Sequence, residues 1–187
     1  GAKPFIFARN CNLGIRACAL DDVILLNDDA LLLMPGGFDA LALAAKAFTE
    51  VGVLSAAISG VVANPSQKPR GSAELRYTDQ RLSFVCPYIR RKVLQDVGLL
   101  DERFIGYGAE DDDYCLRVQK AGLKLATFDG CVMEHSGATL PSTFRTIKNI
   151  DPGSVLGLKL FREKWGLGGR SSPSRSPFHP SERHARV

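Results

Sequence analysis

The sequence predicts an α/β fold with a mostly parallel central sheet flanked by helices, because candidate strands and helices alternate along its 187 residues. Its hydrophobic content of 45% and charged content of 24% are ordinary for a soluble globular protein and allow a sizeable core. A second domain is not expected at this length. We therefore predict one folded domain over residues 1–165 and a disordered tail over residues 166–187.

The first half of the chain is expected to supply two strands and one helix. The short apolar run 23–26 is followed by polar residues, which is typical of a buried strand that ends in a loop. Beyond a break at Pro35, residues 39–48 place apolar side chains on one helical face. Residues 51–62 are β-branched enough for a strand. The Pro- and Ser-containing stretch 64–72 predicts a long, mobile loop.

The second half alternates in the same way. Residues 82–89 alternate between apolar and polar side chains well enough for a strand. The helices expected at 91–97 and 110–121 both end before a glycine, which is a common helix stop. The remaining expected elements are two short strands at 124–128 and 131–134 and a last helix at 154–165.

Charge and cysteine content exclude several function classes. The net charge is +4, but residues 166–187 hold four arginines and one glutamate, so this tail contributes +3 and the body only +1. A nucleic-acid partner is not expected, because such a binder would hold its basic surplus on the folded body. The five cysteines form no CxxC pair, which argues against a zinc site and a disulfide framework. Reduced thiols and a cytoplasmic location are expected.

Four consecutive carboxylates, Glu110 to Asp113, begin the helix expected at 110–121. A helix N-terminus favours one or two acidic residues, but four repel one another unless a cation or a proton-transfer role compensates. A general base needs a tuned pKa, which crowded carboxylates at a helix start can provide. The competing interpretation is an over-acidic cap on a solvated helix. Asp113 and Arg117 are spaced as a supporting i,i+4 pair.

A second acidic pair, Asp28 and Asp29, follows the strand expected at 23–26, at the sheet edge where open α/β folds bind ligands. Adjacent side chains in extended chain point opposite ways, so we expect one of the two to face an ion. Carboxylate oxygens suit Mg²⁺ and Mn²⁺, although an Asx turn is the competing interpretation. His135, just after a predicted strand, is either structural or completes a metal site with Asp29 if the fold brings them together.

In three blocks the chain resembles glycosyltransferase family 2, whose members have the GT-A fold. The blocks are NLGIRAC at 12–18, VILLNDDALLLMPGG at 23–37 and VGLLDERFIGYGAEDDDYCLRVQKAG at 97–122, followed by His135. The resemblance covers about residues 10–143. It implies metal-dependent transfer of a sugar, with inversion, from a nucleotide diphosphate donor to an acceptor hydroxyl. The implied cofactor is Mn²⁺ or Mg²⁺, and the implied acceptor is a glycan, a lipid-linked molecule or another hydroxyl compound.

The resemblance also implies roles for individual residues. Asp29 looks like the metal-holding acid of the family's DxD-type motif, in which Asn27 replaces the frequent first Asp. Glu110 and Asp111 match the family's ED motif, which makes Asp111 the expected base. By class, the implied residues are Asp111 and Glu110 for catalysis, Asn12, Gly14, Asn27, Asp28 and Arg117 for donor binding, and Asp29 and His135 for the metal.

Family members begin with a βα segment that carries the first nucleotide-binding strand, and this segment is expected to be missing here. A sheet edge left open would invite association, so a homo-oligomer is expected. An alternative function is a non-catalytic nucleotide-sugar or glycan binding module derived from the same fold. Only turnover separates that alternative from the enzyme.

Overall fold

The computed structural model describes residues 5–18, 20–105, 108–135 and 155–167. In chain order its elements are α1 (Phe7–Ala17), β1 (Val23–Ile24), β2 (Leu31–Leu32), α2 (Gly37–Ala47), β3 (Val51–Gly60), the 3-10 helix η1 (Pro65–Gln67), β4 (Leu75–Thr78), β5 (Pro87–Ile89), α3 (Arg91–Val97), α4 (Glu110–Lys120), β6 (Lys124–His135) and α6 (Val155–Lys164). No helix within these ranges is both long and apolar enough to cross a membrane.

The strands of the described residues form one mixed sheet in the order β1-β5-β3-β6-β2, with β4 also paired to β6. Only β3 and β6 run parallel, whereas the other four pairings are antiparallel. The prediction of a mostly parallel sheet is therefore wrong. The prediction failed because a parallel neighbour needs a long crossover connection, usually a helix. The strands β1, β2, β4 and β5 are only two to four residues long, and the chain reaches them through loops.

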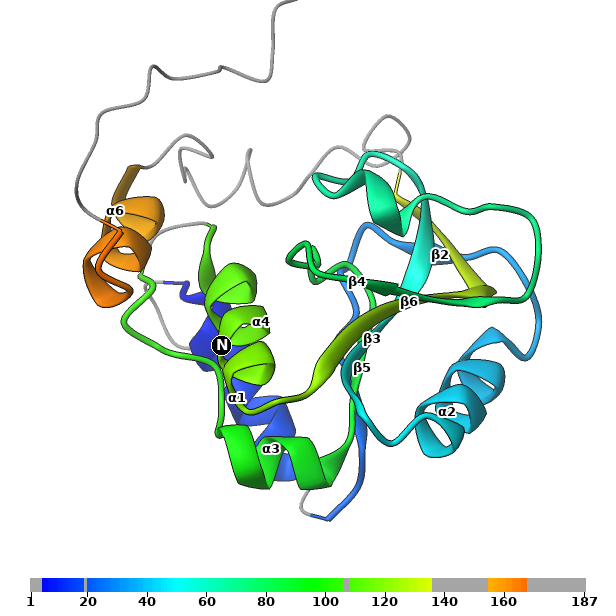
Figure 1. The fold of residues 1–187 in the computed structure, drawn as a ribbon, viewed down its shortest axis with the longest axis horizontal. Helices are drawn as coiled ribbons and strands as arrows, with labels where there is room; N and C mark the ends of the chain where they lie inside the picture. Colours follow the sequence, from blue (N-terminus) through cyan, green and yellow to red (C-terminus); the bar gives the residue numbers. More distant parts are fainter. Residues whose placement is uncertain (1–4, 19, 106–107, 136–154, 168–187) are drawn as a thin grey trace, which may run out of the picture.

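Helices cover both faces of the sheet, with α2 on one side and α1, α3 and α4 on the other (Figure 1). Along β3, Val53 belongs to the core beneath α4, and its neighbour Leu54 belongs to the core beneath α2. This division follows from the alternation of side chains along a strand. Gly52 lets α4 come close, because a Cβ there would lie 2.4 Å from Val118 Cγ1.

Some predicted elements match the observed ones, and others differ. The helices predicted near 91–97 and 110–121 are present as α3 and α4. The two short strands predicted around 124–134 are one strand, β6, whose register against β3 shifts after Phe128. Neither α1 nor β4 was predicted. Of the predicted tail at 166–187, nearly all lies outside the described residues.

The loop expected at 64–72 is better anchored than its composition suggests. It contains η1, and the buried amide of Gln67 donates to Ser55 Oγ and to the carbonyl of Ser83, at 2.8 and 3.0 Å. In return, the amide oxygen accepts from the backbone N–H of Ser83. A polar side chain buried with all its partners holds the loop to the sheet.

Candidate functional site

The antiparallel pairing of β2 with the end of β6 brings Asp29 and His135 together. Asp29 lies in the turn between β1 and β2, and Leu31 of β2 pairs with Glu134 of β6. His135 is the last residue of β6, and its Nε2 lies 3.2 Å from Asp29 Oδ1. The expectation that the fold makes these distant residues meet is confirmed. Their binding of a metal stays a prediction.

The backbone around His135 determines how its ring is protonated. Its Nδ1 lies 2.6 Å from the carbonyl oxygen of Val61, just beyond β3. A carbonyl only accepts hydrogen bonds, so Nδ1 carries the proton and Nε2 faces the Asp29 carboxylate. A lone pair facing a carboxylate is unfavourable without a positive charge between them. The pair therefore needs either a second ring proton or a cation. Metal-binding histidines commonly donate their other ring N–H to a backbone carbonyl, as His135 does to Val61.

Asp29 and His135 would supply two protein ligands to a metal. Within the described residues, no group of three or more His, Cys, Asp or Glu side chains is arranged to hold one. A Mg²⁺ ion commonly takes only one or two protein ligands, and water and substrate phosphates complete its coordination shell. The donor set thus fits a diphosphate-bound Mg²⁺ or Mn²⁺. Asp28, exposed in the same turn, lies beside this pair along the chain.

The start of α4 combines burial, charge and a rare backbone conformation. Ala109, the N-cap, has φ of 72° and is the one non-glycine residue with positive φ in the described ranges. Such a conformation costs about 1–2 kcal/mol in an L-residue. Glu110 is 6% exposed, and its buried Oε2 has no hydrogen-bond partner among the described residues. Backbone strain and an unpartnered carboxylate oxygen together favour a functional role for this helix start.

Both carboxylates of the ED pair hold protons more tightly than ordinary acids. Burial raises the pKa of Glu110, and the nearby charge of Asp111 raises it further. Burial likewise raises the pKa of Asp111, helped by the charge of Asp112 and opposed by hydrogen bonds from backbone N–H groups. One of these bonds joins Asp111 Oδ1 to the backbone N–H of Asp112 at 2.8 Å. A raised pKa suits a group that must accept a proton near neutral pH.

Residues 84–85 connect the acidic helix to the Asp29 turn. The backbone of Phe84 is close enough to the Asp111 carboxylate to lower its pKa. The next residue, Val85, accepts a hydrogen bond from the backbone N–H of Asn27, 3.1 Å away. Asn27 is two residues before Asp29. The candidate base and the candidate metal ligand thus both lie near residues 84–85, and their membership in one site stays a prediction.

Two of the predicted donor-binding residues, Asn12 and Arg117, make hydrogen bonds within the protein. Asn12 is 1% exposed, its amide accepts from the N–H of Leu100, and it donates to Leu100 O and Glu102 Oε1. The guanidinium of Arg117 binds Asp113 and the carbonyls of Val97 and Leu99. These contacts show that both side chains support the loop before α4, and their predicted contact with the donor stays a prediction.

Gly14, also predicted to bind the donor, lies inside α1 and not in a phosphate-cradling loop. It is exposed, and a Cβ there would meet no atom within 4 Å. Close backbone approach therefore does not explain this glycine, and its donor contact stays a prediction.

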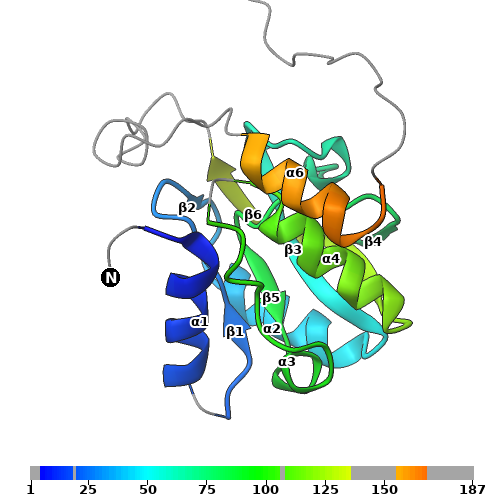
Figure 2. The same cartoon turned by 90° about the vertical axis from the view of Figure 1, so that its left-hand side faces the viewer.

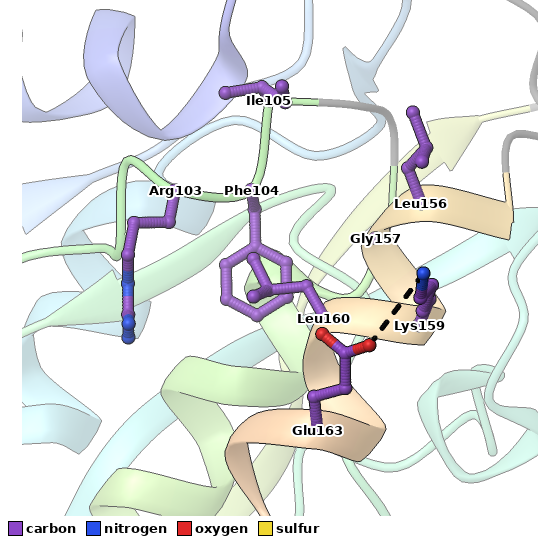
Figure 3. A pocket seen from close by; sticks show the side chains of 8 residues that line it. All are labelled: Arg103, Phe104, Ile105, Leu156, Gly157, Lys159, Leu160 and Glu163. Carbon is purple, nitrogen blue, oxygen red and sulfur yellow. Dashed lines mark ion pairs between the residues drawn. The ribbon is translucent and has the colours of Figure 1, made fainter.

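The sequence also missed the role of α6, which packs beside α4 (Figure 2). Asp113 is fully buried, and Lys164 and Trp165 at the end of α6 both contact its carboxylate. A cavity of about 240 Å³ lies between the loop at 103–105 and α6 (Figure 3). Phe104 and Leu160 are among the residues that line it, and the Lys159–Glu163 ion pair lies at its side. The only sequence signal was that the chain's single tryptophan lies here.

Comparisons with known proteins place this geometry in a fold family. A family model described as the N-terminal domain of galactosyltransferase matches residues 87–138, which include α4 and His135. A solved structure described as the crystal structure of GalNAc-T7 with UDP, GalNAc and Mn²⁺ is similar with a TM-score of 0.54 and 13% identity. The similarity covers 86% of this chain but only 41% of that one. No curated protein sequence matches. The chain thus has the α/β fold of a GT-A glycosyltransferase.

Proposed function

We propose that this chain is a metal-dependent glycosyltransferase that moves a sugar from a nucleotide diphosphate donor to an acceptor hydroxyl with inversion. The observation that carries the proposal is the Asp29–His135 pair, 3.2 Å apart, with the ring nitrogen facing the carboxylate. A bound cation or a second ring proton would each satisfy this arrangement, and the proposal takes the cation because the two groups suit a metal. The fold and the partial match to a galactosyltransferase family support the same activity.

In this proposal Asp29 and His135 would hold the Mn²⁺ or Mg²⁺ that accompanies the donor diphosphate. The bound ion would stabilise the negative charge that develops on the leaving group. His135 is oriented for this task by the carbonyl of Val61, which fixes its ring and its tautomer. Asn27 and Asp28, which are close to Asp29 in the chain, would contact the donor diphosphate.

Asp111 is proposed as the base that removes the proton from the acceptor hydroxyl. Inversion requires attack from the face opposite the leaving group, so base and metal must lie on opposite sides of the donor sugar. The pKa of Asp111 is raised by burial, which favours proton uptake. Glu110, buried with one unpartnered oxygen, would accept a hydrogen bond from a second hydroxyl of the acceptor.

The proposal is tested by calorimetric titration of UDP, GDP and dTDP, each with and without Mn²⁺. UDP is tried first, because the GalNAc-T7 structure contains it. We expect one nucleotide to bind only with the metal. Asp29→Ala should remove the metal-dependent part of the affinity, whereas the control Asp39→Asn, an exposed acid in the first turn of α2, should not change it. Metal-independent binding in the parent protein would refute the metal assignment.

Turnover is tested separately with the same proteins and a panel of donor sugars and acceptors. Asp111→Asn should lower kcat by at least about 100-fold while nucleotide affinity stays within about twofold, as expected for a group that acts in the transition state. Unchanged turnover in this variant would exclude Asp111 as the base. Nucleotide binding without any transfer would favour the non-catalytic binding module.

A further inference from the structure

Asp113, the last of the four consecutive acids, faces the protein interior. Its side chain is fully buried and contacts three donors: Arg117 Nε at 3.0 Å, Lys164 Nζ at 2.7 Å and Trp165 Nε1 at 3.0 Å. A buried carboxylate is stable only when it is paired and hydrogen-bonded, as this one is. Two of the three donors come from the end of α6, so α6 is fixed to the first turn of α4.

Lys164 also reaches a second carboxylate. Its Nζ lies 2.7 Å from Asp101 Oδ2, on the loop that leads toward α4. Asp101 accepts further hydrogen bonds from Arg103, and these, together with Lys164, hold the pKa of Asp101 well below its usual range. One ammonium is thus shared between Asp101 and Asp113. Each of these acids has an arginine partner of its own, and among the described residues Lys164 is the cation that forms an ion pair with both.

We propose that Lys164 is a positioning residue for the reaction, because it ties the start of α4 to the loop at Asp101 and so holds Asp111 in place. The inference rests on the proposed function of Asp111. Asp113 lies half a helical turn after Asp111 and donates its backbone N–H to the carbonyl of Ala109, at 2.9 Å. The left-handed Ala109 is strained, so the helix start keeps its geometry only while its surroundings hold it.

The test compares Lys164→Met with Lys164→Arg and with the control Lys159→Met. Lys159 lies on the same helix, and its ion pair within the described residues is an exposed i,i+4 pair with Glu163 at 3.8 Å. Lys164→Met should lower kcat by about 10- to 100-fold, since a misplacement of about 1 Å is enough for such a loss. Its metal-dependent nucleotide affinity should stay within about twofold. Lys164→Arg, whose guanidinium can still bridge two carboxylates, should recover most of kcat, and Lys159→Met should resemble the parent.

Hydrogen exchange provides a readout that does not depend on activity. In Lys164→Met the amides of Asp112 and Asp113 should exchange at least about tenfold faster than in Lys159→Met, because the helix start opens more often. The emission of Trp165, the single tryptophan, should also shift to longer wavelength as its indole loses the buried carboxylate. If the parent transfers no sugar, the proposed function fails, and the exchange experiment still decides whether Lys164 ties the two segments.

Three results would overturn the inference. The first is unchanged exchange at Asp112 and Asp113 in Lys164→Met. The second is unchanged kcat in that variant when the parent is active. The third is an equal loss of kcat and of nucleotide affinity that Lys164→Arg does not restore, because that pattern indicates general destabilisation.

Discussion

At the scale of single residues, Glu110 is a group at the start of α4 that lowers the stability of the folded protein and is suited to binding or catalysis. It is 6% exposed, and one of its oxygens is buried without a partner in the described part of the chain. An unsatisfied buried polar group costs about 1–3 kcal/mol, and a charged one costs more. The adjacent Ala109 adds backbone strain. Natural proteins keep such unfavourable groups mainly where binding or catalysis needs them. Ligand hydroxyls would satisfy the unpartnered oxygen.

The pH dependence of stability tests this view of Glu110. Its pKa is raised in the folded state, so the folded protein binds more protons than the unfolded chain, and stability falls as pH rises above the ordinary carboxylate range of about 4. Between pH 5 and 8, the parent's free energy of unfolding should fall by about 1–3 kcal/mol more than that of Glu110→Gln. Urea titrations across this pH range measure the difference.

The matched control for that experiment is Glu74→Gln, which changes an exposed glutamate. Its pH dependence should follow the parent's. Identical pH slopes for the parent and Glu110→Gln would show that Glu110 ionises as an ordinary surface acid.

At the scale of elements, an ion pair holds the loop after β3 against the sheet. Arg76 of β4 forms a two-point contact with Asp129 of β6, and the Asp129 side chain is 1% exposed. The same guanidinium donates to the carbonyls of Ser66 and Lys68, and Asp129 also accepts from the N–H of Arg70. Because β3 ends at the candidate metal site, this contact fixes the chain that leaves the site.

Removing one member of the Arg76–Asp129 pair should therefore be costly. Asp129→Asn leaves a buried guanidinium without its counter-charge, and we expect a loss of about 3 kcal/mol in the free energy of unfolding. The control Asp96→Asn breaks the exposed Lys92–Asp96 pair and should cost less than about 1 kcal/mol. Denaturant titration of both variants gives the comparison. A loss for Asp129→Asn no larger than the control's would mean that the ion pair contributes little to holding the loop.

At the scale of the whole molecule, the sheet has an edge that the described chain leaves open. β1 pairs only with β5 within the described residues, and Leu20, shortly before β1, is 82% exposed. An open edge beside an exposed apolar side chain favours association. We expect the average mass from light scattering to rise with concentration in the tens of micromolar range.

A charge near this edge should weaken the association. Leu20→Lys places a lysine beside β1, whereas the control Leu43→Lys changes an exposed leucine on α2. Only Leu20→Lys should lower the average mass. A clean monomer in the parent protein at these concentrations would contradict the prediction of a homo-oligomer.

The sequence by itself determined the local features of this protein. The helices α3 and α4, the strand β3 and the acidic helix start follow from periodicity, glycine stops and charge within a few residues. The resemblance to glycosyltransferases rests on equally local blocks. The Asp113–Arg117 pair was also predicted from spacing. Only the tertiary structure decided the mixed strand directions, the meeting of Asp29 with His135, the supporting role of Asn12 and the tie through Lys164. These depend on strand register and on packing between residues far apart in the chain, which local propensity does not encode.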